Sequence, residues 1–383
     1  MRVLFFLFLF GLGSVLVGCS PADEKTLAAR AEKAYAEKQY AKAIAGYEAL
    51  LRLTGERAVL YRNLALAAYG AKDTSTARKA AEHALRLSGN APEADGCREL
   101  LGMIAEEEKQ PETAFQWYRQ VLNSRDIALR VRVSSRLAQL YRAQGRVDGA
   151  LGMLLSAWYD APQDATTVFN LGMLSVKEPL LLRQAALDFF TLAEHLLPKG
   201  APQVREAQTW RTRLEKNLAR LQQVPAAVGD ASACAKAIKA AKEKQARRQW
   251  RDAEALFAKA TKADPSNFDA ALETGRMAAK NNHKETALKA YAAAIALREN
   301  AQDARIEAAQ LAYDAKRYEL ALSYLRPAMV TQRRNRFLAD LYMRILTAQR
   351  KLPEARVFGE YYLKLYGQAP ESYRKWVNSL PEM

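Results

Sequence analysis

The feature that most constrains the fold is a fixed period of about 34 residues in the carboxy-terminal half of the sequence. Ala253, Ala287, Ala321 and Ala355 follow one another at equal intervals of that length. Four residues after the first three of them lie the large side chains Phe257, Tyr291 and Leu325. Small and large residues at such a period are typical of a repeated helix–turn–helix unit. The period therefore predicts an array of stacked helix pairs, an architecture for binding, but it names no ligand.

The same spacing returns in the amino-terminal half, where the interval from Ala43 to Ala77 is equal to the interval from Ala253 to Ala287. Half of the 383 residues are hydrophobic, whereas Gly (18) and Pro (13) are sparse. Alanine, which has the best helix propensity, recurs at the small positions of the repeat. We therefore expect an all-α chain, an α-solenoid of about nine helix–turn–helix repeats.

The repeats resemble the tetratricopeptide repeat, in which small residues let the two helices approach and large residues fill the gaps between units. The unit that begins at Cys234 carries the small and large residues of that pattern at Ala241, Trp250, Ala253, Phe257, Ala260 and Pro265. The next unit carries them at Gly275, Ala278, Ala287, Tyr291 and Ala294. The resemblance implies a superhelical array that binds other proteins, with no catalytic activity.

The segment boundaries follow from where the pattern is readable. We expect a first array of about five repeats over 24–200, a long charged helix and a linker over 201–233, and a second array of four repeats over 234–367. Pro225 and Gly229 mark the linker, and no helix pair is readable there. Residues 368–383 are predicted to form a helix that caps the end of the array.

The first residues predict export. One basic residue, an apolar run and small residues at its end are typical of a secretory signal peptide, here 1–18. Leu16, Val17, Gly18 and Cys19 resemble the bacterial lipobox. That resemblance implies cleavage before Cys19, acylation of this cysteine with palmitate-type lipid, and a tether over 19–23. Ser20 in place of aspartate implies an outer-membrane protein, lipid-anchored and facing the periplasm.

The net charge and the cysteines indicate little about which ligand the chain binds. The net charge of +16 favours acidic partners or an anionic surface, but the basic residues are spread over all repeats and could equally coat solvated faces. The helix of the unit at Cys234 is the most basic, which leaves an anionic lipid or cell-wall polymer as an alternative ligand. Cys97 and Cys234 lie about four repeats apart, so we expect two buried free thiols.

No set of residues predicts an enzyme. The three histidines, His83, His195 and His283, fall in different repeats without a Cys, His or carboxylate at ligand spacing. No glycine-rich phosphate loop follows a predicted strand. We therefore expect no catalytic residues, no metal site and no cofactor apart from the covalent lipid on Cys19.

The candidate binding residues are those that the repeat frame places on first helices, which usually line the groove of a solenoid. They are Tyr35, Arg62, Asn63, Leu66, Tyr69, Met103, Arg132, Arg136, Gln139, Phe169, Asn170 and Met173. Arg132 and Arg136 share a helix face and could grip a carboxylate of a bound peptide. The alternative is that these residues pack between helices or face solvent.

The sequence thus predicts a membrane-anchored scaffold of the bacterial cell envelope that binds a protein or peptide partner. One hypothesis is a permanent subunit of an outer-membrane or periplasmic assembly machine. The other is a transient adaptor that recruits soluble periplasmic enzymes, such as peptidoglycan hydrolases. Nucleic acid is not an expected partner of an exported protein, and the oligomeric state stays open.

Overall fold

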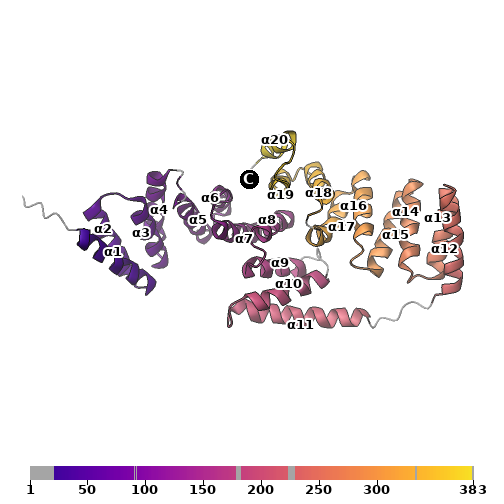
Figure 1. The fold of residues 1–383 in the computed structure, drawn as a ribbon, viewed down its shortest axis with the longest axis horizontal. Helices are drawn as coiled ribbons and strands as arrows, with labels where there is room; N and C mark the ends of the chain where they lie inside the picture. Colours follow the sequence, from indigo (N-terminus) through magenta and orange to yellow (C-terminus); the bar gives the residue numbers. More distant parts are fainter. Residues whose placement is uncertain are drawn as a thin grey trace, which may run out of the picture. The chain divides into compact units, whose positions relative to one another are not determined.

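The computed structural model describes residues 21–89, 91, 93–177, 183–222, 229–332 and 334–381. All regular secondary structure in these residues is helical, in a succession of helix–turn–helix pairs (Figure 1). The predicted all-α repeat architecture is therefore confirmed. The signal peptide 1–18 and the lipobox residues Leu16, Val17, Gly18 and Cys19 lie outside the described residues.

The chain divides into two compact units, Met1–Ser124 and Arg125–Met383. The first unit contains α1 (Pro21–Ala36), α2 (Tyr40–Thr54), α3 (Ala58–Gly70), α4 (Thr74–Ser88), α5 (Glu93–Glu107) and α6 (Pro111–Val121). The division falls inside the segment 24–200, which the repeat pattern treats as one array. The period of the repeats is present on both sides of Ser124, so the period does not predict the boundary between the two units.

The second unit begins with α7 (Ile127–Ala143), α8 (Val147–Asp160), α9 (Ala165–Lys177), α10 (Arg183–Leu196) and the long helix α11 (Pro202–Gln222). It continues with α12 (Ala231–Ala246), α13 (Trp250–Ala263), α14 (Phe268–Lys280), α15 (Lys284–Leu297) and α16 (Gln302–Asp314). The last helices are α17 (Tyr318–Thr331), α18 (Arg336–Ala348), α19 (Leu352–Leu365) and α20 (Glu371–Ser379). The expected long helix is thus α11, and 223–228 of the expected linker lie outside the described residues.

Small residues bring the two helices of a repeat together, as the sequence pattern predicts. A Cβ atom at Gly102 of α5 would lie 2.3 Å from Cε1 of Tyr118 on α6, and one at Gly275 of α14 would lie 2.9 Å from Cδ1 of Tyr291 on α15. Tyr118 and Tyr291 are buried. The aromatic ring therefore occupies the space that a side chain on the partner helix would need.

The turns inside the repeats share one backbone conformation. Seven residues other than glycine have positive φ there, namely Lys38, Lys72, Lys109, Arg248, Asn282, Lys316 and Arg350. Gly145 holds the corresponding position between α7 and α8, at φ 71°. A left-handed residue after a helix lets backbone N–H groups bond back to the last carbonyls, as Lys109 N does to Glu106 O (3.0 Å). Backbone hydrogen bonds thus stabilise these turns.

The second unit departs from a simple solenoid, whose repeats contact only their neighbours. Helix α19 packs directly on α8, although the helices α9 to α18 lie between them in the chain (Figure 1). At their contact a Cβ atom at Gly152 would lie 2.6 Å from Cγ1 of Val357. Gly152 therefore lets α19 approach α8 closely, and the carboxy-terminal repeats return to the middle of the chain.

Ion pairs and hydrogen bonds hold this contact between α8 and the helices α17 to α19, which we call the return seam. The Asp148 carboxylate accepts two hydrogen bonds from Arg326 (2.7 and 3.0 Å) and one from the Tyr342 hydroxyl (2.5 Å). Arg146 Nε lies 2.6 Å from Glu354 Oε1. Asp148 is 3% exposed and Glu354 5%. Both carboxylates are therefore buried, as is Tyr342, whereas the Arg326 and Arg146 side chains are 11% and 26% exposed.

Burial alone would raise the pKa of Asp148. The hydrogen bonds and charge of Arg326, the Tyr342 hydroxyl and the charge of Lys351 outweigh burial and hold that pKa below its usual value. Burial and the neighbouring carboxylate raise the pKa of Tyr342 well above its ordinary value. At neutral pH the seam therefore joins an ionised carboxylate, a guanidinium and a neutral phenol.

Helix α20 packs on α19 at the carboxy terminus. Val377 is fully buried, and its methyl groups occupy the place where a Cβ at Gly359 would stand. The Tyr373 ring lies 4.6 Å from that of Tyr362.

Cys97 and Cys234, each in its own unit, are buried free thiols, as expected.

Candidate functional site

The predicted groove residues of the first unit lie mainly on α3 and differ in exposure. Arg62 and Asn63 are half-buried, and Arg62 donates to Asn63 Oδ1 (3.4 Å). The Arg62 Nε atom is buried without a hydrogen-bond partner in the described structure. The Tyr69 hydroxyl donates to Glu107 Oε1 at 2.6 Å. The polar side chains of α3 are thus partly engaged with neighbours, and Arg62 keeps one free donor.

The apolar candidates of the first unit are Leu66, Met103 and Tyr35, and they differ in solvent exposure. Leu66 packs against the hydrophobic core, and Met103 is half-buried. Tyr35 is 36% exposed, with its ring 5.9 Å from that of Tyr40. Of these three, only Tyr35 presents a large surface to solvent.

In the second unit, two of the predicted contacts are wrong. Phe169 is 8% exposed and packs edge-on against Phe190, with ring centroids 6.1 Å apart. Met173 is also buried. Both side chains point into the space between α9 and its neighbours, because the apolar stripe of a helix is drawn to the core. Their buried apolar surface stabilises the repeat instead of forming a ligand contact.

The neighbouring Asn170 is different. It is 8% exposed, and its Nδ2 atom has no hydrogen-bond partner in the described structure. It lines a small cavity of about 10 Å³ together with Gln139 and Arg142 of α7. Such a volume admits about one atom the size of a water oxygen. A buried amide donor without a partner is costly, so Asn170 is poised to donate to an oxygen placed there.

The face of α7 that leads to this cavity carries the other candidates. Arg132 and Gln139 are exposed, and Arg136 is half-buried. Residues four apart lie one above the other on a helix, so Arg132 and Arg136 form a basic row that runs toward Gln139. We call Arg132, Arg136, Gln139, Arg142 and Asn170 the α7–α9 surface.

The corresponding face of the carboxy-terminal repeats is already occupied. Glu273 stands two residues before Gly275, as Asn170 stands two before Gly172. Arg276 binds Glu307 through two nitrogens (2.7 to 3.1 Å) and Glu273 through a third (2.8 Å). The hydrogen bonds that Arg276 donates to Glu307 raise the pKa of Arg276, and with those donated to Glu273 they outweigh the opposing effect of burial. This face satisfies its own charges, whereas the α7–α9 surface keeps an unpaired donor.

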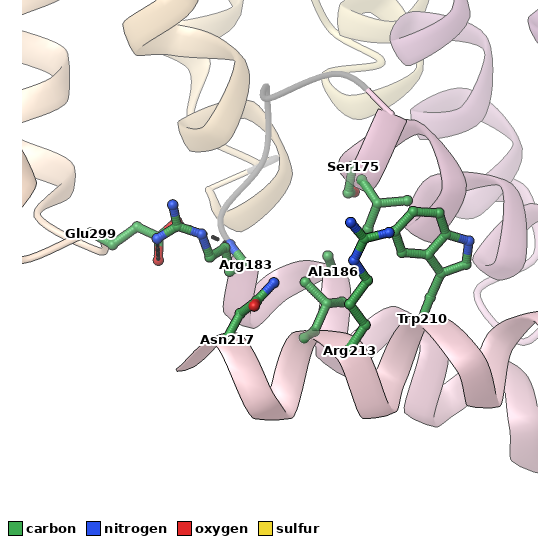
Figure 2. A pocket seen from close by; sticks show the side chains of 9 residues that line it. Ser175, Arg183, Ala186, Trp210, Arg213, Asn217 and Glu299 are labelled. Atoms are coloured by element: carbon green, nitrogen blue, oxygen red, sulfur yellow. Dashed lines mark hydrogen bonds and ion pairs between the residues drawn. The ribbon is translucent and has the colours of Figure 1, made fainter. Parts of the chain in front are cut away.

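A larger pocket of about 330 Å³ lies farther along the second unit (Figure 2). Helix α11 contributes Trp210, Arg213, Leu214 and Asn217, and the ends of α9 and α10 contribute Ser175, Val176, Arg183 and Ala186. Glu299, from the connection between α15 and α16, closes one side. The pocket thus combines the long helix with the repeats that return toward it.

The two arginines that line this pocket have different partners. Glu299 accepts a hydrogen bond from the backbone N–H of Arg183 (3.1 Å), and its other oxygen lies 4.0 Å from the Arg183 guanidinium. The Arg213 guanidinium stands over the Trp210 ring, 5.2 Å from its centroid. The repeat pattern did not reveal this site. Trp210, Arg213 and Asn217 stand at helical spacing on one face of α11, but nothing in the sequence brings Glu299 to them.

No described helix is long and apolar enough to cross a membrane. No group of three or more His, Cys, Asp or Glu side chains in the described part of the chain could hold a metal ion.

Comparison with known proteins identifies the repeat. A family profile of the tetratricopeptide repeat matches residues 62–128 and 238–293. The chain therefore contains tetratricopeptide repeats in each of its two units. Among curated proteins, no sequence matches the chain.

Several solved structures are similar in fold. MamA is 14% identical with a TM-score of 0.37, and the match covers 54% of this chain and 97% of that one. The TPR2AB domain of yeast Sti1, solved in a complex with pHSP90, is 14% identical with a TM-score of 0.24, covering 90% and 99%. YrrB, a protein with an unusual peptide-binding site, is 16% identical with a TM-score of 0.29, covering 71% and 97%. These likenesses concern the fold alone.

Proposed function

We propose that this tetratricopeptide-repeat chain is a non-enzymatic scaffold that binds an extended peptide segment of a partner protein on the α7–α9 surface. The observation that carries the proposal is the buried Nδ2 donor of Asn170, which has no partner in the described structure and belongs to a residue that lines a one-atom cavity. An extended peptide offers carbonyl oxygens that need such donors.

The rest of the α7–α9 surface fits the same ligand. Gln139 and Arg142 line the cavity beside Asn170, and an amide can accept from a peptide N–H as well as donate to a carbonyl. Arg132 and Arg136 add positive charge along the approach. A peptide with an acidic side chain near the segment held by Asn170 would therefore be favoured, because opposite charges attract across the approach.

The binding test uses the full chain purified in detergent and a displayed library of random peptides. Selected peptides would be measured on the wild type, on Asn170→Leu, which removes the donor at similar volume, and on Gln120→Ala, an exposed control on α6. We expect Asn170→Leu to weaken binding about tenfold and Gln120→Ala to change nothing. Equal binding by Asn170→Leu would overturn the α7–α9 assignment, and a library without binders would overturn peptide binding itself.

We also propose that lipid on Cys19 anchors the scaffold to the outer membrane, facing the periplasm. The support is the lipobox-like run Leu16, Val17, Gly18 and Cys19 at the end of an apolar segment. Several buried acyl chains would give stable anchoring, since each buried methylene contributes about 0.8 kcal/mol. Metabolic labelling with an alkyne fatty acid should mark the wild type and not Cys19→Ala. Equal labelling of both would refute the anchor.

The anchored scaffold would serve as a subunit of an envelope assembly machine, with a transient adaptor for soluble periplasmic enzymes as the alternative. Salt separates the two, because exposed charged contacts are screened at high ionic strength. A partner that remains bound to the wild type in detergent and high salt supports the subunit. A partner that is lost as salt is raised, and that binds Cys19→Ala equally, supports the adaptor.

A further inference from the structure

The pocket beside α11 has the chemistry of a second, smaller binding site. Its volume of about 330 Å³ lies at the lower end of the range for small-ligand sites, about 300–1,000 Å³. Its lining combines two arginines, one glutamate and one indole with a short apolar wall. Glu299 engages Arg183, which leaves the positive charge of Arg213 for a ligand.

Arg213 differs from its neighbour Arg211 on the same helix. Arg211 pairs with Glu194 through Nε (2.7 Å) and with Glu215 through Nη1 (2.8 Å), so its charge is already paired with two carboxylates. Arg213 has no carboxylate partner among the described residues and stands over the Trp210 ring instead. An arginine held on an aromatic face keeps its edge donors available, because stacking uses the plane of the guanidinium. Trp210 thus holds Arg213 in a position to bind an anion.

We infer that this pocket binds a carboxylate attached to a residue with an apolar side chain. Arg213 would donate two hydrogen bonds to the carboxylate, and Asn217, one turn along α11, would bind the adjoining amide. Val176, Ala186 and Leu214 would cover the apolar side chain. The inference rests on the proposed function, because it assigns the pocket to one residue of a bound peptide.

The pocket depends on the return of the carboxy-terminal repeats. Glu299 belongs to the α15–α16 connection, whereas Arg183 begins α10, and their contact spans 116 residues of sequence. Figure 2 shows Glu299 and Arg183 on one side and Trp210 with Arg213 on the other. Glu299 therefore lies beside Arg183, and Arg213 on the opposite side of the pocket supplies the anion site.

The carboxylate could come from a peptide carboxy terminus or from an acidic side chain, and the test separates them. The full chain in detergent would be labelled with 5-fluorotryptophan, with the Trp210 signal assigned through Trp210→Phe. The probes are N-acetyl-leucine, N-acetylleucinamide, and N-acetylglutamic acid amidated at its α-carboxyl. We expect N-acetyl-leucine to shift the Trp210 fluorine signal and the leucinamide to leave it in place. A shift with the glutamate derivative assigns an acidic side chain as a second source.

Arg213→Gln keeps polarity and removes the charge, and Arg205→Gln is the matched control on an exposed part of α11. We expect Arg213→Gln to weaken N-acetyl-leucine binding about 10- to 100-fold, with Arg205→Gln unchanged. Unchanged affinity in Arg213→Gln, equal shifts with acid and amide, or no shift of Trp210 with any probe would each overturn the inference. Peptide binding that depends on Asn170 would survive that failure, so the two proposals are tested separately.

Discussion

The return seam makes a quantitative prediction about Asp148. Its carboxylate is the shared acceptor for Arg326 and Tyr342, and Lys351 lies 3.6 Å away. Asp148→Ala would leave the Arg326 guanidinium, 11% exposed, with Glu319, whose side chain is 64% exposed, as its nearest carboxylate among the described residues, at 3.5 Å. Removing one partner of a buried ion pair costs about 3–5 kcal/mol, because the remaining charge loses its buried counter-ion. We expect a loss of this size in the free energy of unfolding of the second unit.

The assay combines urea unfolding with hydrogen exchange read by mass spectrometry. Peptides from α8 and α17 to α19 should lose protection in Asp148→Ala, whereas α12 and α13 should keep it, since they lie away from the seam. Asp188→Ala, an exposed carboxylate on α10, is the control and should change stability by less than about 0.5 kcal/mol. A loss below about 1 kcal/mol, or a uniform loss of protection along the chain, would refute the reasoning.

A second substitution sharpens the test. Arg326→Met in the Asp148→Ala background replaces the unpaired charge by an apolar side chain of similar length. Replacing a whole buried pair by apolar groups is often neutral or stabilising. The double variant should therefore be more stable than Asp148→Ala alone. If it is less stable, the cost of Asp148→Ala does not come from the unpaired guanidinium.

Three further predictions concern the turns, the seam and acid. Lys109→Gly should raise the free energy of unfolding by up to about 1 kcal/mol, because φ is 58° there, while Gly145→Ala, at φ 71°, should lower it by a similar amount. Gly152→Val should lower it by about 1–3 kcal/mol, since its Cβ would meet Val357. Stability should fall as pH drops below about 4, because the lowered pKa of Asp148 stabilises the fold only while that carboxylate is ionised.

Urea unfolding measures the free energy of unfolding for all three predictions. For each prediction, a different result would contradict it. Equal stability of Lys109→Gly and wild type would mean that the turn is not strained. A neutral Gly152→Val would mean that α8 and α19 separate without cost. The acid effect should shrink in Asp148→Asn, and an undiminished loss of stability in that variant would assign it to other carboxylates.

The candidate site could be predicted only in part. The repeat frame places Asn63, Arg132, Arg136, Gln139 and Asn170 on first helices, because a helical period fixes which residues share a face. The frame cannot separate exposed from buried positions near the edge of the apolar stripe, so it wrongly places Phe169 and Met173 among the ligand contacts. Phe169 is buried because its ring packs against the ring of Phe190, on the neighbouring helix α10.

The helices, their pairing within repeats and the close approach at Gly275 follow from the amino-acid sequence, because each depends on residues within a single repeat of the chain. The packing of α19 on α8 is visible in the three-dimensional fold alone, and so are the burial of Asp148 and the pocket beside α11 that depend on it. An aspartate and a glycine in one helix are compatible with a solvated face. Their partners, Arg326 and Val357, lie several repeats away in the sequence, and no local pattern encodes a contact over that distance.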